Sequence, residues 1–582
     1  MLCWSVKLVF VRGSSPVRAP AKRRTRLVSL VRSAAPPLPE CGLAALSAFL
    51  LVLAFPDFGL WPLAWIALVP LVVTVARRPH VPQAFTLGWI TGTLFFYGSC
   101  WWLTHSMIHY GGIPRPLAFV LLAPLTLVGG LFLAVFASCF ARLCARWGLR
   151  ALLLVPFLWT AQEWMRLGVT GQLWNAIGYS QAFHPPLIQA ASWGGVYAVG
   201  FLITTVNAAL AYALLRRTTR SMIIALLPVA LVIVVLYASA AFNFIDAGEK
   251  SEPAAVVIGI QPNVPANFSR TLAENEALVN RHLTMSDDAL REWERARPSQ
   301  MLNGMLPSGG ANETTNRQSN EPTTRSLPRV VIWPESPMNF TYTRDAQFRE
   351  IVGQFAHEQQ TAVLFNALEP APAGGAYNSA VMIDRQGRPV AQYDKIRLLP
   401  FGEYVPLPRW LPGTSLVTAI VGEFTPGADY PLMPLGGGAR AGVFICIESA
   451  YPSIARRFVR DGADALINIS NDGYLGRTPV LRQHLANTVF RAVENRRPVL
   501  RVTNTGISAH ISPRGEVSGA TDSFAPAVRT WLVSRTSGDQ TFYTRHGDLF
   551  VMFCAMVSVL VLLVSFVPAQ HKSLSRSGRN YE

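Results

Sequence analysis

Eight apolar segments of roughly membrane-spanning length constrain this chain more than any other feature. A helix needs about 20 mostly apolar residues to cross the hydrocarbon core of a bilayer. Such segments lie near Gly42–Phe55, Leu60–Val75, Ala84–Leu103, Leu117–Phe140, Ala151–Trp164, Tyr197–Leu215, Met222–Phe242 and Leu549–Val567. The seventh and eighth are separated by a long stretch of soluble-looking sequence. The sequence therefore predicts a polytopic α-helical membrane domain with about eight spans and one large domain outside it.

The distribution of basic residues predicts how the chain is oriented. Short cytoplasmic loops carry an excess of Lys and Arg. Here basic residues gather in the first 40 residues, in alternate loops and after the last span, and these segments together account for the formal charge of +17. Both termini are therefore predicted to be cytoplasmic and the large domain to lie on the other side. Because that domain is close to neutral, the basic pI does not indicate a nucleic-acid partner.

These patterns divide the chain into five parts. The predicted parts are a basic cytoplasmic extension (1–40), a membrane domain of seven helices (41–245), an extracytoplasmic domain (246–545), an eighth transmembrane helix (546–570) and a cytoplasmic tail (571–582). Within the extracytoplasmic domain, residues 299–325 are rich in Asn, Ser, Thr, Gly and Pro, which is typical of a flexible surface insertion.

The large domain alternates short apolar runs with amphipathic stretches, a pattern typical of an α/β layered fold. The predicted strands are Ala255–Ile260, Val330–Trp333, Ala362–Ala367, Ser379–Ile383, Gly442–Cys446, Ala465–Ile469 and Val499–Thr503. The predicted helices are Leu272–Arg297, Asp345–Glu358, Tyr451–Asp461 and Pro479–Asn495. Hairpin turns at 384–387 and 512–515 add antiparallel pairs. Two such sheets between helices would fit this pattern.

Cys446 is the candidate nucleophile of this domain. Of the seven Cys in the chain, it is the only one in the extracytoplasmic domain, so it has no disulfide partner there. A lone thiol in such a place is either reactive or a small buried apolar group. The strand that ends at Cys446 is followed by Ile447 and by Glu448.

Two further polar residues follow predicted strands and complete a possible catalytic set. Glu335 ends the segment Val330–Glu335 and can take the proton of a thiol. Lys395 follows Tyr393 and Asp394 and offers a positive charge to a tetrahedral intermediate, together with the backbone N–H of Ile447. Any one of these residues alone is commonplace, but the ordered set Glu335, Lys395 and Cys446 indicates nucleophilic catalysis.

Four motifs resemble those of the apolipoprotein N-acyltransferases, which are membrane members of the nitrilase superfamily. The longest is Tyr393–Pro406, which reads YDKIRLLPFGEYVP. The others are Trp333–Glu335, Asn468–Gly476 and the segment from Gln483-His484 to Arg491–Glu494. The resemblance also extends to the eight-span plan. It leaves out the first 40 residues and the insertion.

This resemblance implies a fold and a set of site residues. The fold is an αββα nitrilase-like sandwich, with Glu335, Lys395 and Cys446 as the catalytic triad. Glu403 and Glu448 are implied as supporting residues that orient Lys395 or the incoming amine, or that serve only as structural ion-pair partners.

The resemblance also implies an activity. A phospholipid donates a fatty acyl chain to the Cys thiol, and the thioester passes it to the α-amino group of the diacylglyceryl-cysteine of an apolipoprotein. The implied location is the bacterial inner membrane, with the catalytic domain on the periplasmic side, and no metal or other cofactor is expected.

The sequence departs from the family pattern at two aromatic positions. After Gln261–Pro265, a Trp that the family often has is missing, and Phe268 and Arg270 stand nearby. Tyr474 stands where the family often has Trp. We expect Phe268 and Tyr474 to contribute to substrate binding.

Three alternatives fit parts of the sequence. A transporter would favour charges within the spans, yet only Glu163 and Arg166 lie near the end of one. A scaffold gives no reason for the order of Glu335, Lys395 and Cys446. The remaining alternative is a membrane-tethered nitrilase-type amidase that hydrolyses small amides, although such an enzyme needs at most one anchor.

Overall fold

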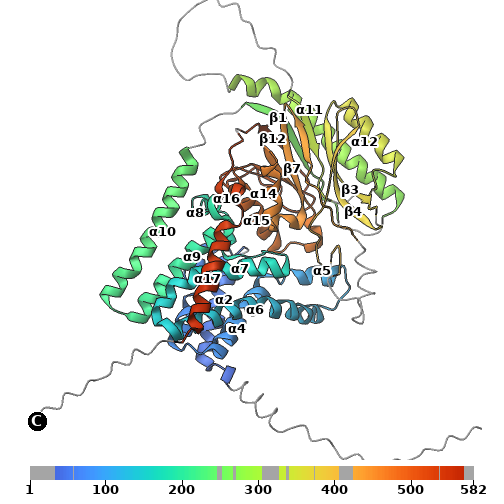
Figure 1. Cartoon of the computed structure of the whole chain (residues 1–582). Helices are drawn as coiled ribbons and strands as arrows, with labels where there is room; N and C mark the ends of the chain where they lie inside the picture. Colours follow the sequence, from blue (N-terminus) through green and yellow to red (C-terminus); the bar gives the residue numbers. More distant parts are fainter. Residues whose placement is uncertain are drawn as a thin grey trace, which may run out of the picture.

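The computed structural model describes residues 33–56, 58–245, 252–265, 270–303, 327–335, 340–372, 374–400, 402–405, 424–536 and 538–568. It contains a helical part and an α/β part that lie against each other (Figure 1). Most of the predicted N-terminal extension, most of the insertion and the whole C-terminal tail fall outside the described residues.

A helix forms within each of the eight predicted apolar segments. These are α2 (Leu38–Ala54), α3 (Val69–Arg77), α4 (Val81–Ser99), α6 (Arg115–Trp147), α7 (Val155–Thr170), α9 (Ala191–Arg216), α10 (Thr219–Ile245) and α17 (Leu549–Phe566). The shorter elements η1 (Trp61–Trp65), α5 (Leu103–His109), η2 (Gly148–Leu154), η3 (Ile177–Gln181) and α8 (Pro185–Ile188) join them. The second segment is not one continuous helix, because η1 and α3 each begin anew with a proline in their first turn.

Four helical stretches in the described part of the chain are long and apolar enough to cross a membrane. They are Arg115–Thr170, Ala191–Arg216, Thr219–Ala241 and Leu549–Phe566. The apolar helices at 38–54 and 61–77 are shorter. Small residues let neighbouring helices approach closely, since a Cβ added to Gly92 of α4 would lie 2.8 Å from the Cα of Gly130 in α6.

Within the described residues, the α/β part contains two six-stranded sheets. The first has the order β12-β1-β2-β3-β4-β5 and the second the order β11-β10-β9-β8-β7-β6. The strands are β1 (Pro253–Gln261), β2 (Arg329–Ile332), β3 (Ala362–Pro370), β4 (Ala376–Ile383), β5 (Pro389–Asp394), β6 (Leu432–Gly436), β7 (Ala439–Ile445), β8 (Ala465–Ser470), β9 (Val499–Thr503), β10 (Ala509–Ile511), β11 (Val517–Ser518) and β12 (Ala527–Ser534).

Parallel pairing at the centre of each sheet sets where the strand ends meet. In the first sheet β1, β2 and β3 are parallel, and in the second β7, β8 and β9 are parallel. The two predicted hairpin turns join the antiparallel pairs β4–β5 and β10–β11. All seven predicted strands are confirmed. The strands β5, β10 and β11 were expected only as partners at the two hairpin turns, and β6 and β12 were not predicted.

Helices cover the outer faces of the two sheets. The helices α11 (Leu272–Asn303) and α12 (Ala346–Glu358) pack on the first sheet in a separate core that includes Trp333 and Phe348. The helices α14 (Pro452–Arg460) and α15 (Val480–Asn495) lie between the second sheet and the membrane helices (Figure 1). Their core is continuous with the space between the sheets and with the membrane helices. Residues 299–303, predicted to begin the insertion, instead end α11.

Candidate active site

The three predicted catalytic residues each follow the end of a strand and meet between the two sheets. Glu335 lies three residues past the end of β2, Lys395 directly follows β5, and Cys446 directly follows β7. Glu335 and Lys395 are buried and Cys446 is partly exposed. The end of β5 is fixed because the N–H of Lys395 donates to the carbonyl of Asn378 in β4.

Lys395 is held between two carboxylates. Its Nζ lies 3.3 Å from Oε1 of Glu335 and 2.9 Å from Oε1 of Glu403. The second oxygen of Glu403 accepts from the N–H of Leu399 at 2.7 Å. Burial alone would lower the pKa of Lys395, but Glu335 and Glu403 raise it well above its usual value. The ammonium therefore stays charged, and Glu403 is a direct partner of Lys395.

Asn378 is a site residue that the sequence reasoning missed. Its Nδ2 donates to Oε1 of Glu335 at 2.9 Å and to Oε1 of Glu403 at 2.7 Å. Its own Oδ1 accepts from Asn366 of β3. Because these bonds fix both carboxylates relative to the sheet, Asn378 sets the geometry around Lys395. The only signal in the sequence is the polar pair Asn378-Ser379 within a mostly apolar strand.

Cys446 occupies a strained turn at the start of the 3₁₀ helix η4 (Cys446–Ala450). Its φ of 52° lies in the left-handed region, which non-glycine residues seldom adopt. Burial and the Glu335 carboxylate raise the pKa of the thiol well above its usual value, and Lys395 opposes them only in part. The resting group is therefore a thiol, which needs a base at the moment of attack.

Glu448 fixes the turn that carries Cys446. Its Oε2 accepts from the N–H of Ile445, and its Oε1 accepts from Tyr393 and from the N–H groups of Ile396 and Arg397, all at 2.7–3.0 Å. Burial raises the pKa of Glu448 to about 7, although the bonds from Ile445 and Arg397 oppose this. Glu448 thus binds the loop after Lys395 to the Cys446 turn.

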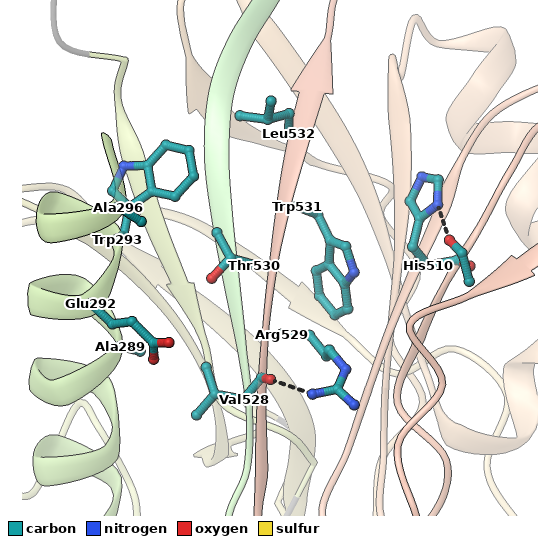
Figure 2. A pocket seen from close by; sticks show the side chains of 11 residues that line it. Ala289, Glu292, Trp293, Ala296, His510, Val528, Arg529, Thr530, Trp531 and Leu532 are labelled. Carbon is teal, nitrogen blue, oxygen red and sulfur yellow. Dashed lines mark hydrogen bonds between the residues drawn. The ribbon is translucent and has the colours of Figure 1, made fainter. Parts of the chain in front are cut away.

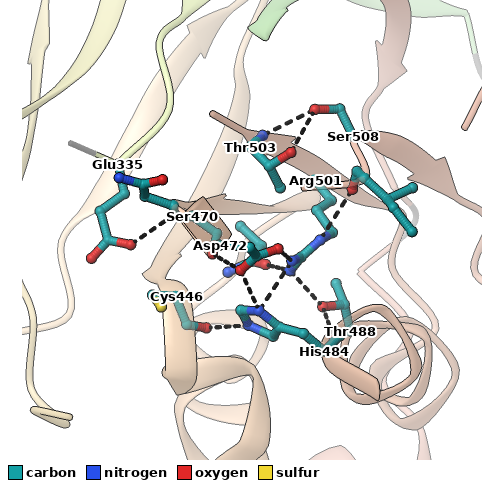
Figure 3. A network of polar contacts seen from close by, with 12 residues as sticks. Glu335, Cys446, Ser470, Asp472, His484, Thr488, Arg501, Thr503 and Ser508 are labelled. Carbon is teal, nitrogen blue, oxygen red and sulfur yellow. Dashed lines mark hydrogen bonds and ion pairs between the residues drawn. The ribbon is translucent and has the colours of Figure 1, made fainter. Parts of the chain in front are cut away.

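A second polar network lies on the other side of Cys446 (Figure 3). Nε2 of His484 lies 2.8 Å from the carbonyl oxygen of Cys446, and Nδ1 lies 2.9 Å from Oδ1 of Asp472. Nη2 of Arg501 pairs with Oδ2 of the same carboxylate at 2.8 Å. Glu335 also reaches this side, since its Oε2 accepts from the N–H of Asn471 at 3.0 Å. The motifs named in the sequence contain Asn471, Asp472 and His484, but the sequence indicated neither their contacts nor the part played by Arg501.

The helix α15, which carries His484, is also bound to the membrane helices. Oε1 of Gln483 accepts from the indole N–H groups of Trp102 and Trp174, and its Nε2 donates to the carbonyls of Pro56 and Ser99. Further along the helix, Glu494 accepts from the N–H of Val196 at 3.0 Å. Gln483 and Glu494 therefore bind the second sheet's helical layer to the membrane domain.

The two predicted aromatic substrate contacts have different outcomes. Phe268 lies outside the described residues. Tyr474 lies in η5 (Asp472–Leu475) against α5, where its carbonyl accepts from Ser106 at 2.7 Å and its ring is 5.4 Å from that of Tyr110. The structure thus places Tyr474 at the contact between the α/β part and the membrane domain.

A surface hollow of about 570 Å³ lies away from this cluster. It is lined by α11 and by the edge strands of both sheets, with Trp293, Trp531 and His510 among its residues (Figure 2). Neither Glu335, Lys395 nor Cys446 contributes to it. Within the described ranges, no three His, Cys, Asp or Glu side chains are arranged to hold a metal ion.

The family model of the carbon-nitrogen hydrolases matches residues 316–540. A second model, the N-terminal domain of apolipoprotein N-acyltransferase, matches residues 47–209. The apolipoprotein N-acyltransferase of Geobacter metallireducens is 33% identical over 531 residues, which cover 90% of this chain and 95% of that protein. The enzyme of the same name from Rhizobium meliloti is 29% identical, covering 87% of this chain and 94% of that protein.

This chain therefore belongs to the apolipoprotein N-acyltransferase family, and the resemblance noted in the sequence is confirmed. Together with its apolar helices, this membership identifies it as a membrane protein. Among solved structures, Nit3 of Saccharomyces cerevisiae, a member of branch 10 of the nitrilase superfamily, aligns with a TM-score of 0.35 and 15% identity. That alignment covers 52% of this chain and 98% of Nit3.

Proposed function

We propose that this protein transfers a fatty acyl chain from a phospholipid, through a thioester on Cys446, to the α-amino group of the diacylglyceryl-cysteine of an apolipoprotein. The observation that carries the proposal is the buried contact of Lys395 with Glu335 and Glu403 beside the Cys446 turn, in a chain whose second sheet is bound to membrane helices. Both substrates are anchored in lipid, so a site attached to the bilayer suits them.

In the first half of the proposed reaction, Glu335 takes the proton of Cys446 as the sulfur attacks the ester carbonyl of the phospholipid. Charge on the carbonyl oxygen is stabilised by Lys395 and by the backbone N–H of Ile447. The C–O bond then breaks, and the lysophospholipid leaves as an alcohol that receives the proton from Glu335. The product is a thioester on Cys446.

In the second half, the α-amino group attacks the thioester carbonyl and loses a proton to Glu335. The C–S bond breaks, the amide forms, and the sulfur regains a proton as the thiol. One base serves both halves because it begins and ends each half without a proton. We assign Glu403 to the orientation of Lys395 and Glu448 to the geometry of the Cys446 turn, with Tyr474 and Phe268 as substrate contacts.

The proposed arrangement in the membrane follows the basic loops. It has eight spans, both termini in the cytoplasm of a bacterium and the domain at 246–545 on the periplasmic side of the inner membrane. The proposal keeps the basic cytoplasmic extension at 1–40 and the seven-helix membrane domain at 41–245. It also keeps the eighth transmembrane helix at 546–570 and the cytoplasmic tail at 571–582. A reporter fused after Phe244 is expected to be active only outside the cytoplasm, and activity in the cytoplasm would reverse the orientation.

The purified protein, given a phospholipid and a diacylglyceryl-cysteinyl peptide, tests the activity. We expect a peptide heavier by one fatty acyl group together with a lysophospholipid. The same preparation is offered small aliphatic amides. Release of ammonia from the amides without acylation of the peptide would replace the proposal with the amidase alternative.

A further inference from the structure

We propose that His484 is a positioning residue that holds the Cys446–Ile447 peptide group and so directs the Ile447 N–H toward the oxygen of the reacting carbonyl. This inference rests on the proposed role of Cys446 as the nucleophile. Among the described residues, no hydrogen bond joins the side chain of His484 to the thiol of Cys446.

The first step of the argument is the geometry of one peptide bond. The N–H and C=O of a trans peptide point in opposite directions. His484 Nε2 lies 2.8 Å from the Cys446 oxygen, so a bond there fixes the direction of the Ile447 N–H as well. Cys446 has a φ of 52°, a conformation that needs restraint from its surroundings. His484 and Glu448 supply that restraint from either side of the turn.

The second step concerns the protons of His484. Nε2 faces the Cys446 carbonyl oxygen, which can only accept, so Nε2 carries a hydrogen and donates to it, while Nδ1 faces the Asp472 carboxylate. Burial alone would raise the pKa of Asp472, but His484 and Arg501 lower it well below its usual value, so this carboxylate is ionised. Arg501 Nη2, which pairs with the same carboxylate, also lies 3.1 Å from Nδ1.

The bond from His484 has a consequence for the neighbouring N–H. A donor on a carbonyl polarises the whole peptide group, which strengthens its N–H as a donor. The Ile447 N–H is therefore both aimed and strengthened. Because both imidazole nitrogens of His484 are engaged by other groups, the ring is not placed to act as the base for Cys446.

The third step is the position of α15. Gln483, the residue before His484, makes four hydrogen bonds to membrane-domain groups at 2.9–3.1 Å. The ring of Trp174 also lies 5.8 Å from that of His484. The imidazole is therefore located by the membrane domain rather than by the Cys446 turn that it supports.

Two reactions of Cys446 separate this role from a merely structural one. Iodoacetamide alkylates the sulfur and releases iodide, with no negative oxygen formed. The p-nitrophenyl ester of a fatty acid acylates the sulfur and releases p-nitrophenolate through a tetrahedral intermediate that needs the Ile447 N–H. In His484→Asn of the full-length protein in detergent, we expect acylation to slow by roughly 100-fold, the scale of one oxyanion donor. Alkylation should change by less than about twofold, because that reaction bypasses the donor.

Asn495→Ala is the control for the packing of α15. Asn495 lies on the same buried helix and also makes two hydrogen bonds, to the carbonyl of Arg491 and from Thr544. We expect both reactions to keep their wild-type rates in this variant. A loss of acylation as large as that of His484→Asn would assign the effect to helix packing and overturn the proposal.

Asp472→Asn provides a second variant that keeps the shape of the network and removes its negative charge. Its acylation should slow by less than in His484→Asn, again with alkylation unchanged. If His484→Asn does not fold, Asp472→Asn decides by the same comparison. Parallel loss of both reactions in a folded variant, or no loss of acylation, would refute the positioning role. Failure of wild-type Cys446 to react with either reagent would instead refute its assignment as nucleophile.

Discussion

The two sheets of the α/β part both contribute residues to the candidate site, but their outer faces pack against different parts of the molecule. The first sheet provides Glu335 and Lys395, and its outer face packs on α11 and α12 in a core of its own. The second sheet provides Cys446, and its outer face packs on α14 and α15, which share a core with the membrane helices. The proposed nucleophile thus lies in the half that is attached to the membrane domain, and the proposed base lies in the other half.

This difference has an energetic consequence. Gln483 and Glu494 satisfy buried groups of the membrane domain, so their loss leaves donors without acceptors there. The matching buried contact behind the first sheet is internal, with Trp333 Nε1 donating to Ser286 at 3.0 Å. A substitution at the membrane contact should therefore lower the reactivity of Cys446 as well as stability. A substitution behind the first sheet should lower stability alone.

The largest expected effect is in Glu335→Gln, which removes the proposed base from the first sheet. Thioester formation should slow by roughly 10³-fold, within the range for a lost general base, and the rise of the acyl-enzyme mass over time measures it. Glu369→Gln is the matched control, since Glu369 is also buried in the first sheet but accepts from the N–H of Thr343 rather than from Lys395 or Asn378. A wild-type rate in Glu335→Gln would show that the base lies elsewhere.

Glu403→Gln should have the next largest effect. The Gln side chain keeps one oxygen, which can accept either from Lys395 or from the N–H of Leu399. It lacks the negative charge that Glu403 places beside the Lys395 ammonium. We expect kcat to fall by about 10- to 100-fold, the scale of a misplaced electrostatic donor, while KM for the phospholipid stays the same. Steady-state acyl transfer measures both constants, and a change confined to KM would place Glu403 in substrate binding instead.

A pair of variants tests the comparison of the two sheets directly. Gln483→Leu leaves the indole N–H groups of Trp102 and Trp174 without their acceptor, at a cost of about 1–3 kcal/mol for each buried donor. It should lower both Tm and the acylation rate. Ser286→Ala removes the acceptor of Trp333 and should lower Tm with little change in acylation. Equal losses of acylation in the two variants would contradict the proposed difference between the sheets.

The smallest expected effect is a dependence of stability on pH. Burial raises the pKa of Glu448 to about 7 from an ordinary 4.5, so between these values the folded state binds more proton than the unfolded state. The contribution of Glu448 to stability is full below about pH 4.5 and is lost as the pH rises through about 7. Thermal unfolding at pH 5 and pH 8 should show a smaller decrease in Glu448→Gln than in the wild type. An equal or larger decrease in the variant would contradict this assignment.

The sequence predicted elements that depend on local pattern. Apolar periodicity located the helices and the seven strands, and the motif around Lys395 indicated the family. It did not locate β12, whose place at the edge of the first sheet depends on pairing with β1 from almost the other end of the domain. The broken segment Leu60–Val75 shows that two prolines outweigh an apolar run.

Two supporting residues of the site, Asn378 and His484, were given no role from the sequence for a related reason. Asn378 and His484 act through contacts with residues far away in the sequence, and a lone Asn or His carries no signal of such a partner. Glu448 was noticed through its place beside Cys446. Its contacts with Tyr393, Ile396 and Arg397 arise only when the two sheets come together.

Intact mass spectrometry of the purified protein after incubation with phospholipid tests the central claim most directly. The wild type should gain the mass of one fatty acyl group, and hydroxylamine, which cleaves thioesters, should remove it. Cys446→Ala should gain no mass under the same conditions. An acyl group that persists on Cys446→Ala, or a wild type that is never acylated, would contradict the account.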